Sequence, residues 1–310
     1  MIKGFVTIAT GDIKYFKLAR NLLRSYKENT DNSYKFALIT NEINIYTDEF
    51  DDVVLLDNAS NSWMDKIELL SKCPYDENIF IDADCLIYND INYLWDNFRN
   101  ADDFSCFGLA LPLDSKKGWF TSDVKKYYDI HFVTHLHGML YYIKKGETID
   151  RMYELCKKVI TDYNNFEFKA FNDTLADEPV FALAMAIMNL RPIAREPQYY
   201  CFVPYTTSFH SNYLKRNVHF ENPTDGEIVG CDIVHWGNKN TELALYKSEK
   251  DKINYLYKDN KSLIYKLYGA CIYKTNIIYY LYITIDKVKS ITSFCEWVLD
   301  RVYCKMNIRR

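Results

Sequence analysis

Two aspartates separated by a single residue follow a short apolar run. Ile79, Phe80 and Ile81 have the composition of a buried strand, and Asp82 and Asp84 come directly after it. Carboxylates beside a buried strand are costly to desolvate unless a partner neutralises them. Two hard oxygen ligands this close together favour a divalent cation, and a bound cation in turn favours a phosphate-bearing substrate.

Strand-like and helix-like segments alternate around this pair. The strand-like segments cover residues 4–9, 34–40, 52–56, 79–81, 139–143 and 228–235. Helix periodicity covers residues 16–26, 63–70, 149–160 and 180–188. This alternation predicts an α/β fold with a mostly parallel sheet and helices on both faces. Ligands of such sheets bind beyond the carboxyl ends of the strands, where segments 10–12 and 82–84 would both lie.

Charge divides the chain into two regions. Residues 246–310 carry 13 Lys and Arg against 6 Asp and Glu, whereas residues 1–245 carry 25 basic and 36 acidic residues. We expect residues 1–245 to form the α/β domain and residues 246–310 to form an appendage of basic, Tyr-rich amphipathic helices. Such helices can lie on an anionic membrane surface. They can equally pack against the main domain or against a second subunit, which leaves a homo-oligomer as an alternative.

Bulk composition argues against several classes of protein. A net charge of −4 over 310 residues is not that of a nucleic-acid binder. The nine cysteines form no CxxC pair, which favours free thiols in a reducing cytosol over a disulfide framework or a zinc site. The N-terminus is not typical of a signal peptide, and no apolar run reaches the roughly 18 residues of a spanning helix. We therefore expect a cytoplasmic protein, with peripheral contact at the inner face of a membrane through the tail.

The motifs resemble, in content and order, those of nucleotide-sugar glycosyltransferases of the GT-A fold, most closely the family 8 type (glycogenin-like and lipopolysaccharide galactosyltransferase-like). The resemblance covers roughly residues 1–245 and rests on segments 7–12, 63–66, 79–87, 177–178 and 235–239. An Asp-x-Asp motif alone is common by chance. It is more specific here because a Lys-bearing helix precedes it and a His-x-Gly-x-Lys motif follows much later. The family's Asp-Gln pair is Asp177-Glu178 in this chain.

The resemblance implies a donor site for a UDP-sugar and a metal ion. Asp82, Asp84 and His235 are the expected metal ligands, and their oxygen and imidazole donors suit Mn²⁺ or Mg²⁺. The nucleoside and the diphosphate would contact residues from four segments, namely Ala9, Thr10, Asp12, Lys66, Ile81, Asp82, Ala83, Gly237 and Lys239. Glycine allows close backbone approach, and lysine offsets the charge of the leaving group.

Asp177 and Glu178 are the expected catalytic residues. In an inverting enzyme one of them would be the general base that activates the acceptor hydroxyl. In a retaining enzyme of family 8 type they would lie near the anomeric carbon and stabilise positive charge or orient the acceptor. The resemblance favours retention, although acids in the first turn of a helix also serve simply as N-terminal charges.

The expected acceptor is a saccharide or a lipid-linked saccharide in cell-surface glycan synthesis. A histidine cluster, His131, His135 and His137, is interpreted as part of an acceptor-side loop rather than as a metal site. Tyr15 could stack on the nucleoside base or serve as a core aromatic residue.

Two other functions remain alternatives. A sugar-1-phosphate nucleotidyltransferase also combines a parallel sheet with metal-bound acids, but it should carry a Gly-rich basic loop where this chain has Thr10-Gly11-Asp12-Ile13. A non-catalytic sugar-nucleotide-binding protein has less need of the Asp82, Asp84 and His235 set.

Overall fold

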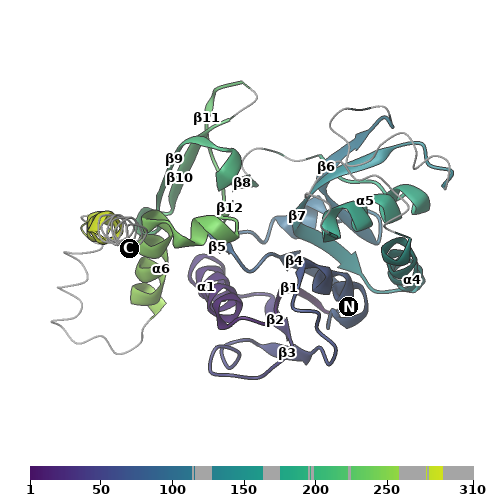
Figure 1. Ribbon diagram of the computed structural model, residues 1–310, viewed down its shortest axis with the longest axis horizontal. Helices are drawn as coiled ribbons and strands as arrows, with labels where there is room; N and C mark the ends of the chain where they lie inside the picture. Colours follow the sequence, from purple (N-terminus) through teal and green to yellow (C-terminus); the bar gives the residue numbers. More distant parts are fainter. Residues whose placement is uncertain are drawn as a thin grey trace, which may run out of the picture.

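A six-stranded mixed sheet forms the centre of the protein (Figure 1). The computed structural model describes residues 1–113, 115, 128–162, 175–194, 196, 199–222, 225–257, 277 and 279–288. The strands follow the order β3-β2-β1-β4-β7-β6. Their bounds are β1 (Lys3–Ala9), β2 (Lys35–Thr40), β3 (Asp52–Leu55), β4 (Glu77–Ile81), β6 (Phe104–Leu111) and β7 (Val133–Lys144). Strands β1 to β4 are parallel, and β7 runs antiparallel to both of its neighbours. The predicted α/β fold with a mostly parallel sheet is confirmed.

Helices cover both faces of this sheet, and two apolar clusters lie beneath them. Successive side chains of a strand point to opposite faces. Phe5 therefore belongs to one cluster and Val6 to the other, and Ile79 and Phe80 divide in the same way. Helix α1 (Ile13–Asn29) packs on the first cluster, whereas α4 (Glu147–Thr161) and α5 (Asp177–Met188) pack on the second. Shorter helical segments are η1 (Trp63–Glu68), α2 (Leu69–Lys72) and α3 (Leu94–Asn97).

Two smaller sheets follow the central one (Figure 1). Strands β5 (Cys85–Ile87), β12 (Ile233–His235) and β8 (Tyr200–Phe202) form one of them, and β9 (Thr207–Asn212), β10 (Asn217–Glu221) and β11 (Ile228–Gly230) form the other. The 3₁₀ helix η4 (Val203–Tyr205) joins β8 to β9, η5 (Tyr213–Lys215) joins β9 to β10, and η6 (Asn238–Glu242) follows β12. Because β12 pairs antiparallel with β5, His235 lies opposite Cys85, directly beside the Asp-x-Asp segment.

The single strand predicted over residues 228–235 is wrong. The structure has two strands there, β11 and β12, in different sheets. The chain turns between them at Asp232, whose carboxylate accepts hydrogen bonds from Asn89 Nδ2 and Tyr93 Oη, both at 2.9 Å. These bonds anchor a polar residue at the point where an apolar run suggested one continuous strand.

Helix α6 (Ala244–Tyr257) spans the predicted boundary between residues 245 and 246 and packs against α1. Tyr246 and Ile253 are buried in the interface. Residues 279–288 are helical and contact α6 through Tyr282 Oη, which donates to Asp251. The other helices expected in the tail, around residues 264 and 294–302, lie outside the described residues. Within the described ranges, no helix is both long and apolar enough to cross a membrane.

Candidate active site

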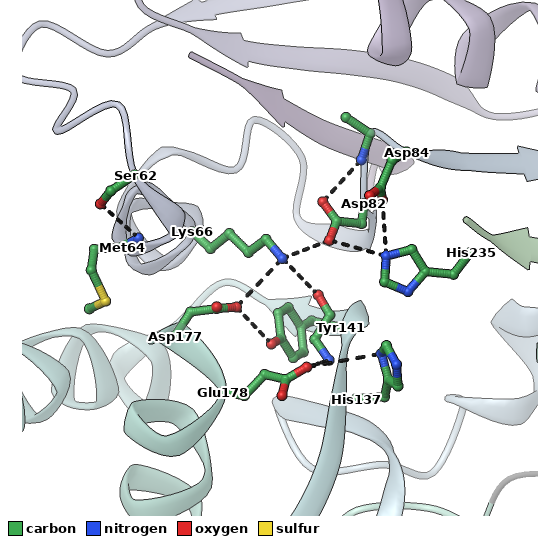
Figure 2. Close-up of polar contacts among 12 residues, drawn as sticks. Ser62, Met64, Lys66, Asp82, Asp84, His137, Tyr141, Asp177, Glu178 and His235 are labelled. Atoms are coloured by element: carbon green, nitrogen blue, oxygen red, sulfur yellow. Dashed lines mark hydrogen bonds and ion pairs between the residues drawn. The ribbon is translucent and has the colours of Figure 1, made fainter. Parts of the chain in front are cut away.

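The predicted metal ligands meet at one point, between β4 and β12 (Figure 2). Nε2 of His235 lies 3.0 Å from Oδ1 of Asp84 and 3.8 Å from Oδ2 of Asp82. Apart from this ion pair, Oδ1 of Asp84 is buried without a hydrogen-bond donor among the described residues. Two carboxylates and one imidazole form a donor set that suits Mn²⁺ or Mg²⁺. The residues therefore fit the predicted cation, with Asp84 Oδ1 as the atom most in need of one.

Electrostatics tie these three groups together. Burial raises the pKa of Asp84, but the charge and hydrogen bond of His235, together with the charge of Lys66, outweigh it, so that the pKa lies below its ordinary value. Burial lowers the pKa of His235, whereas the carboxylate of Asp84 raises it above its ordinary value. The pKa of Asp82 is raised, first by burial and then by the neighbouring charge of Asp84, despite the opposing charge of Lys66. The attraction between Asp84 and His235 thus favours the ionised form of both groups.

Cys85 lies next to this cluster. Its Sγ, a carboxylate oxygen of Asp84 and a ring nitrogen of His235 all lie within 4.8 Å of one another. The side chain of Cys85 is fully buried in the apolar cluster below the sheet. Burial raises the pKa of the thiol well above its ordinary value, and the charge of Asp84 adds to this effect. A protonated thiol is a weak ligand, so the two carboxylates and the imidazole remain the main donor set.

Lys66 connects this cluster to the predicted catalytic pair (Figure 2). Its Nζ donates to Oδ2 of Asp82 at 2.7 Å and to the carbonyl oxygen of Gly138 at 3.1 Å, and it lies 3.6 Å from Oδ2 of Asp177. Burial alone would lower the pKa of the ammonium, but the carboxylates of Asp177 and Asp82 outweigh it and raise the pKa above its ordinary value. Lys66 is therefore charged and shared between two acids.

Asp177 and Glu178 begin helix α5, as the sequence predicts. Oδ2 of Asp177 accepts a hydrogen bond from Tyr141 Oη at 3.3 Å. Oε1 of Glu178 accepts one from the backbone N–H of Gly138 at 2.5 Å and lies 4.0 Å from Nδ1 of His137. Burial, followed by the charge of Asp177, raises the pKa of Glu178 to about 7. A carboxyl group with this pKa can exchange a proton near neutral pH.

The residues predicted to contact the nucleoside lie at the carboxyl end of β1. Ala9 is buried, and Oγ1 of Thr10 donates to Oδ2 of Asp65 at 2.6 Å. Asp12 is the N-cap of α1, where its Oδ1 accepts the N–H of Lys14 at 2.7 Å. Ile81 and Ala83 are buried, so they can contact a ligand chiefly through backbone groups.

The segment after β12 lies beside the start of α1. Nζ of Lys14 donates to Oδ1 of Asn238 at 2.7 Å, and Nδ2 of Asn238 donates to Tyr15 Oη at 3.2 Å. Gly237 has φ +70, a conformation that favours glycine, and a Cβ there would lie 3.0 Å from the ring of Phe202. Lys239 is exposed on the turn that follows. The predicted diphosphate contacts, Gly237 and Lys239, thus flank Asn238, which contacts the start of α1.

Several residues of the site were not predicted. Gly138 belongs to none of the motifs singled out in the sequence, yet its backbone binds both Lys66 and Glu178. The ring of Phe202 stacks on His235 with centroids 4.7 Å apart, and the His137 ring meets His235 edge to face at 5.0 Å. The interpretation of the histidines as a loop is wrong for His135 and His137, which lie on strand β7. A β-period in residues 133–144 was the available signal for that strand.

No family model and no curated protein sequence matches the chain. Among solved structures, the chain is similar to the galactosyltransferase LgtC in complex with donor and acceptor sugar analogues. The TM-score is 0.51 at 10% identity, and the match covers 86% of this chain and 99% of that chain. The protein has the GT-A fold. It is also similar to the bifunctional glycosyltransferase WbbM in its apo form, with a TM-score of 0.46, 11% identity and coverage of 78% of this chain and 47% of that chain.

Proposed function

We propose that this GT-A protein is a metal-dependent glycosyltransferase that moves a hexose from a UDP-sugar to a saccharide or glycolipid acceptor. The observation that carries the proposal is the convergence of Asp82, Asp84 and His235 beside Lys66 and the Asp177-Glu178 pair. Six ionisable groups from four separate segments meet where open α/β sheets bind their ligands. A site of this kind suits a substrate that carries a diphosphate next to a reacting carbon.

Each group has a role in the proposed reaction. Asp82, Asp84 and His235 would hold a divalent ion, which would supply Lewis-acid stabilisation of the leaving diphosphate. The ammonium of Lys66, beside Asp82, and that of Lys239, four residues after His235, would add positive charge to the diphosphate site. Asp177, held by Tyr141, stabilises positive charge at the anomeric carbon.

Glu178 lies beside His137 and would serve the acceptor side of the site. Its raised pKa allows it to accept the proton of an acceptor hydroxyl near pH 7, or to orient that hydroxyl in a retaining reaction. We favour retention, a role in cell-surface glycan synthesis, and a cytoplasmic location with peripheral membrane contact through residues 246–310.

A screen of UDP-sugars tests this function. The full chain is mixed with each donor, with and without Mn²⁺. Thermal unfolding is followed in one set of samples, and release of UDP by the folded protein is followed in another. We expect one UDP-hexose to raise the unfolding temperature only when Mn²⁺ is present, and to be hydrolysed slowly. A sugar-1-phosphate nucleotidyltransferase would instead be stabilised by a nucleoside triphosphate. The proposal is wrong if no nucleotide sugar changes the melting curve with metal present.

A further inference from the structure

Lys66 lies between the acids of the metal site and those of the catalytic pair (Figure 2). It comes from η1, whereas its partners come from the end of β4, from β7 and from the start of α5. The side chain is 14% exposed, so its ammonium has little access to water. In a site of this kind a buried ammonium is retained only where carboxylates or carbonyl oxygens surround it.

The contact between Lys66 and Asp82 uses the carboxylate oxygen that faces the metal site. Oδ2 of Asp82 accepts from Nζ of Lys66 at 2.7 Å, and the same Oδ2 is the atom 3.8 Å from Nε2 of His235. The other oxygen, Oδ1, accepts the N–H of Ala83 at 3.1 Å. Both oxygens of Asp82 are therefore already engaged, and a cation that takes Oδ2 must share it with the ammonium.

Asp177 gives the ammonium a second place to bind. Its Oδ2 lies 3.6 Å from Nζ, on the side away from Asp82. A small movement of Nζ toward Asp177 would release Oδ2 of Asp82 without exposing the charge to an apolar surface. The geometry thus contains two acceptor positions for one ammonium.

We infer that Lys66 is a positioning residue that holds Asp82 away from a divalent cation until an anionic group draws its ammonium aside. This inference rests on the proposed metal site. It implies that the metal alone binds weakly. It also implies that a diphosphate and the metal strengthen each other's binding. A diphosphate that draws the Lys66 ammonium away from Asp82 raises the affinity for the metal, and the metal must then raise the affinity for the diphosphate by the same factor.

Mn²⁺ binding to the full chain, measured by titration calorimetry and by the electron-spin signal of free Mn²⁺, tests the inference without catalysis. In the variant Lys66→Met, we expect the Kd for Mn²⁺ alone to fall at least about tenfold, because a positive charge next to the ion is removed. Lys66→Arg keeps the charge and should keep the weak binding. Lys66→Gln replaces the Met variant if the latter does not unfold cooperatively, since its amide is uncharged but remains polar in the buried site.

Lys3→Met is the matched control. Lys3 is also a partly buried lysine paired with an acid, Glu77, at 2.9 Å, but at the opposite end of the sheet. Its removal should leave the Kd for Mn²⁺ unchanged. If Lys66→Met and Lys66→Gln bind Mn²⁺ no more tightly than the wild type, and only their affinity for UDP falls, Lys66 serves the diphosphate alone and the inference is overturned. If neither the wild type nor any variant binds Mn²⁺, the metal site of the proposed function fails as well.

Discussion

Gly138 has no room for a side chain. A Cβ at this position would lie 2.8 Å from Cγ of Glu178 and 2.9 Å from Tyr141 Oη. The Gly138→Ala variant must therefore displace Glu178 or Tyr141, which we expect to cost about 1–3 kcal/mol of stability. Urea unfolding measures this loss, and donor hydrolysis by the variant should fall more than its donor affinity. A variant as stable and as active as the wild type would show that these contacts are not as close as described.

Glu178 makes stability depend on pH. Its pKa is raised to about 7 in the folded protein, whereas its ordinary value is 4.5. Folding therefore favours the protonated form, and the wild type should lose stability as pH rises from about 5 to about 8. Glu178→Gln keeps an oxygen acceptor for Gly138 but does not ionise, so it should lack this loss, which amounts to roughly 3 kcal/mol.

Urea unfolding of Glu178→Gln and the wild type at pH 5 and pH 8, with a chelator present, measures the effect. The exposed Glu154 provides the control variant, Glu154→Gln, whose pH profile should follow that of the wild type. Parallel profiles for Glu178→Gln and the wild type would contradict the raised pKa.

Asp84 is the most dependent on a cation of the three predicted ligands. Its replacement by Asn keeps the shape of the side chain but removes the charge beside His235. We expect Asp84→Asn to weaken Mn²⁺ binding more than tenfold and to abolish metal-dependent turnover, while its unfolding temperature in a chelator stays close to that of the wild type. Near-normal turnover in this variant would show that the metal assignment is wrong.

At the scale of elements, one carboxylate holds the loop that places η1. Asp65 accepts hydrogen bonds from Thr10 Oγ1, from the N–H and Oγ of Ser60, and from the N–H of Asn61, at 2.6 to 3.0 Å. These bonds join η1 to the end of β1 and so set where Lys66 enters the site. Asp65 can hold this loop only because folding brings four hydrogen-bond donors to its carboxylate.

Asp65→Asn therefore tests an element rather than a single contact. The amide nitrogen cannot accept hydrogen bonds, so at least one buried donor loses its partner at a cost of about 1–3 kcal/mol. We expect lower stability in thermal unfolding and weaker binding of UDP, because both β1 and η1 shift. The exposed Asp57, replaced by Asn, should change neither quantity.

At the scale of the whole molecule, α6 behaves as part of the main domain. Glu249 and Lys252 form a buried ion pair at 2.7 Å, and Tyr88 Oη donates to the same Glu249. A chain cut after Leu245 loses Lys252 and Glu249 and exposes the apolar surface of α1, so it should unfold at a lower temperature than the full chain. A chain cut after Tyr257 keeps these contacts and should bind a UDP-sugar normally.

The chain that ends at Tyr257 also tests the role of the tail. If the basic residues after position 257 contact anionic lipid, the chain 1–257 should lose binding to vesicles that contain phosphatidylglycerol while keeping its unfolding temperature within a few degrees. Equal vesicle binding by the full chain and by the chain 1–257 would refute membrane contact through the tail. Light scattering of the same samples gives the molecular mass of each chain, and so shows whether removal of the tail changes the oligomeric state.

The sequence predicted the strongly periodic elements and the residues that meet at the site, but not all the contacts between them. Strands β1, β2 and β4 and helices α1, α4 and α5 lie within a few residues of their predicted bounds. Strand β6 was missed because it is an edge strand with a register shift near Gly108, which interrupts the alternation of apolar residues. The roles of Gly138 and Phe202 depend on register across the sheets, which no local pattern encodes.

The pairing of β12 with β5 also has a consequence for how the protein is made. Ribosomes complete the segment of Asp82 and Asp84 long before His235 leaves the exit tunnel, and the two segments can pair only afterwards. Contacts between such distant parts of a chain form late, because a long loop must first close. A nascent chain would thus hold Asp84 without its imidazole partner, and the ability to bind metal would appear only once β12 has paired with β5.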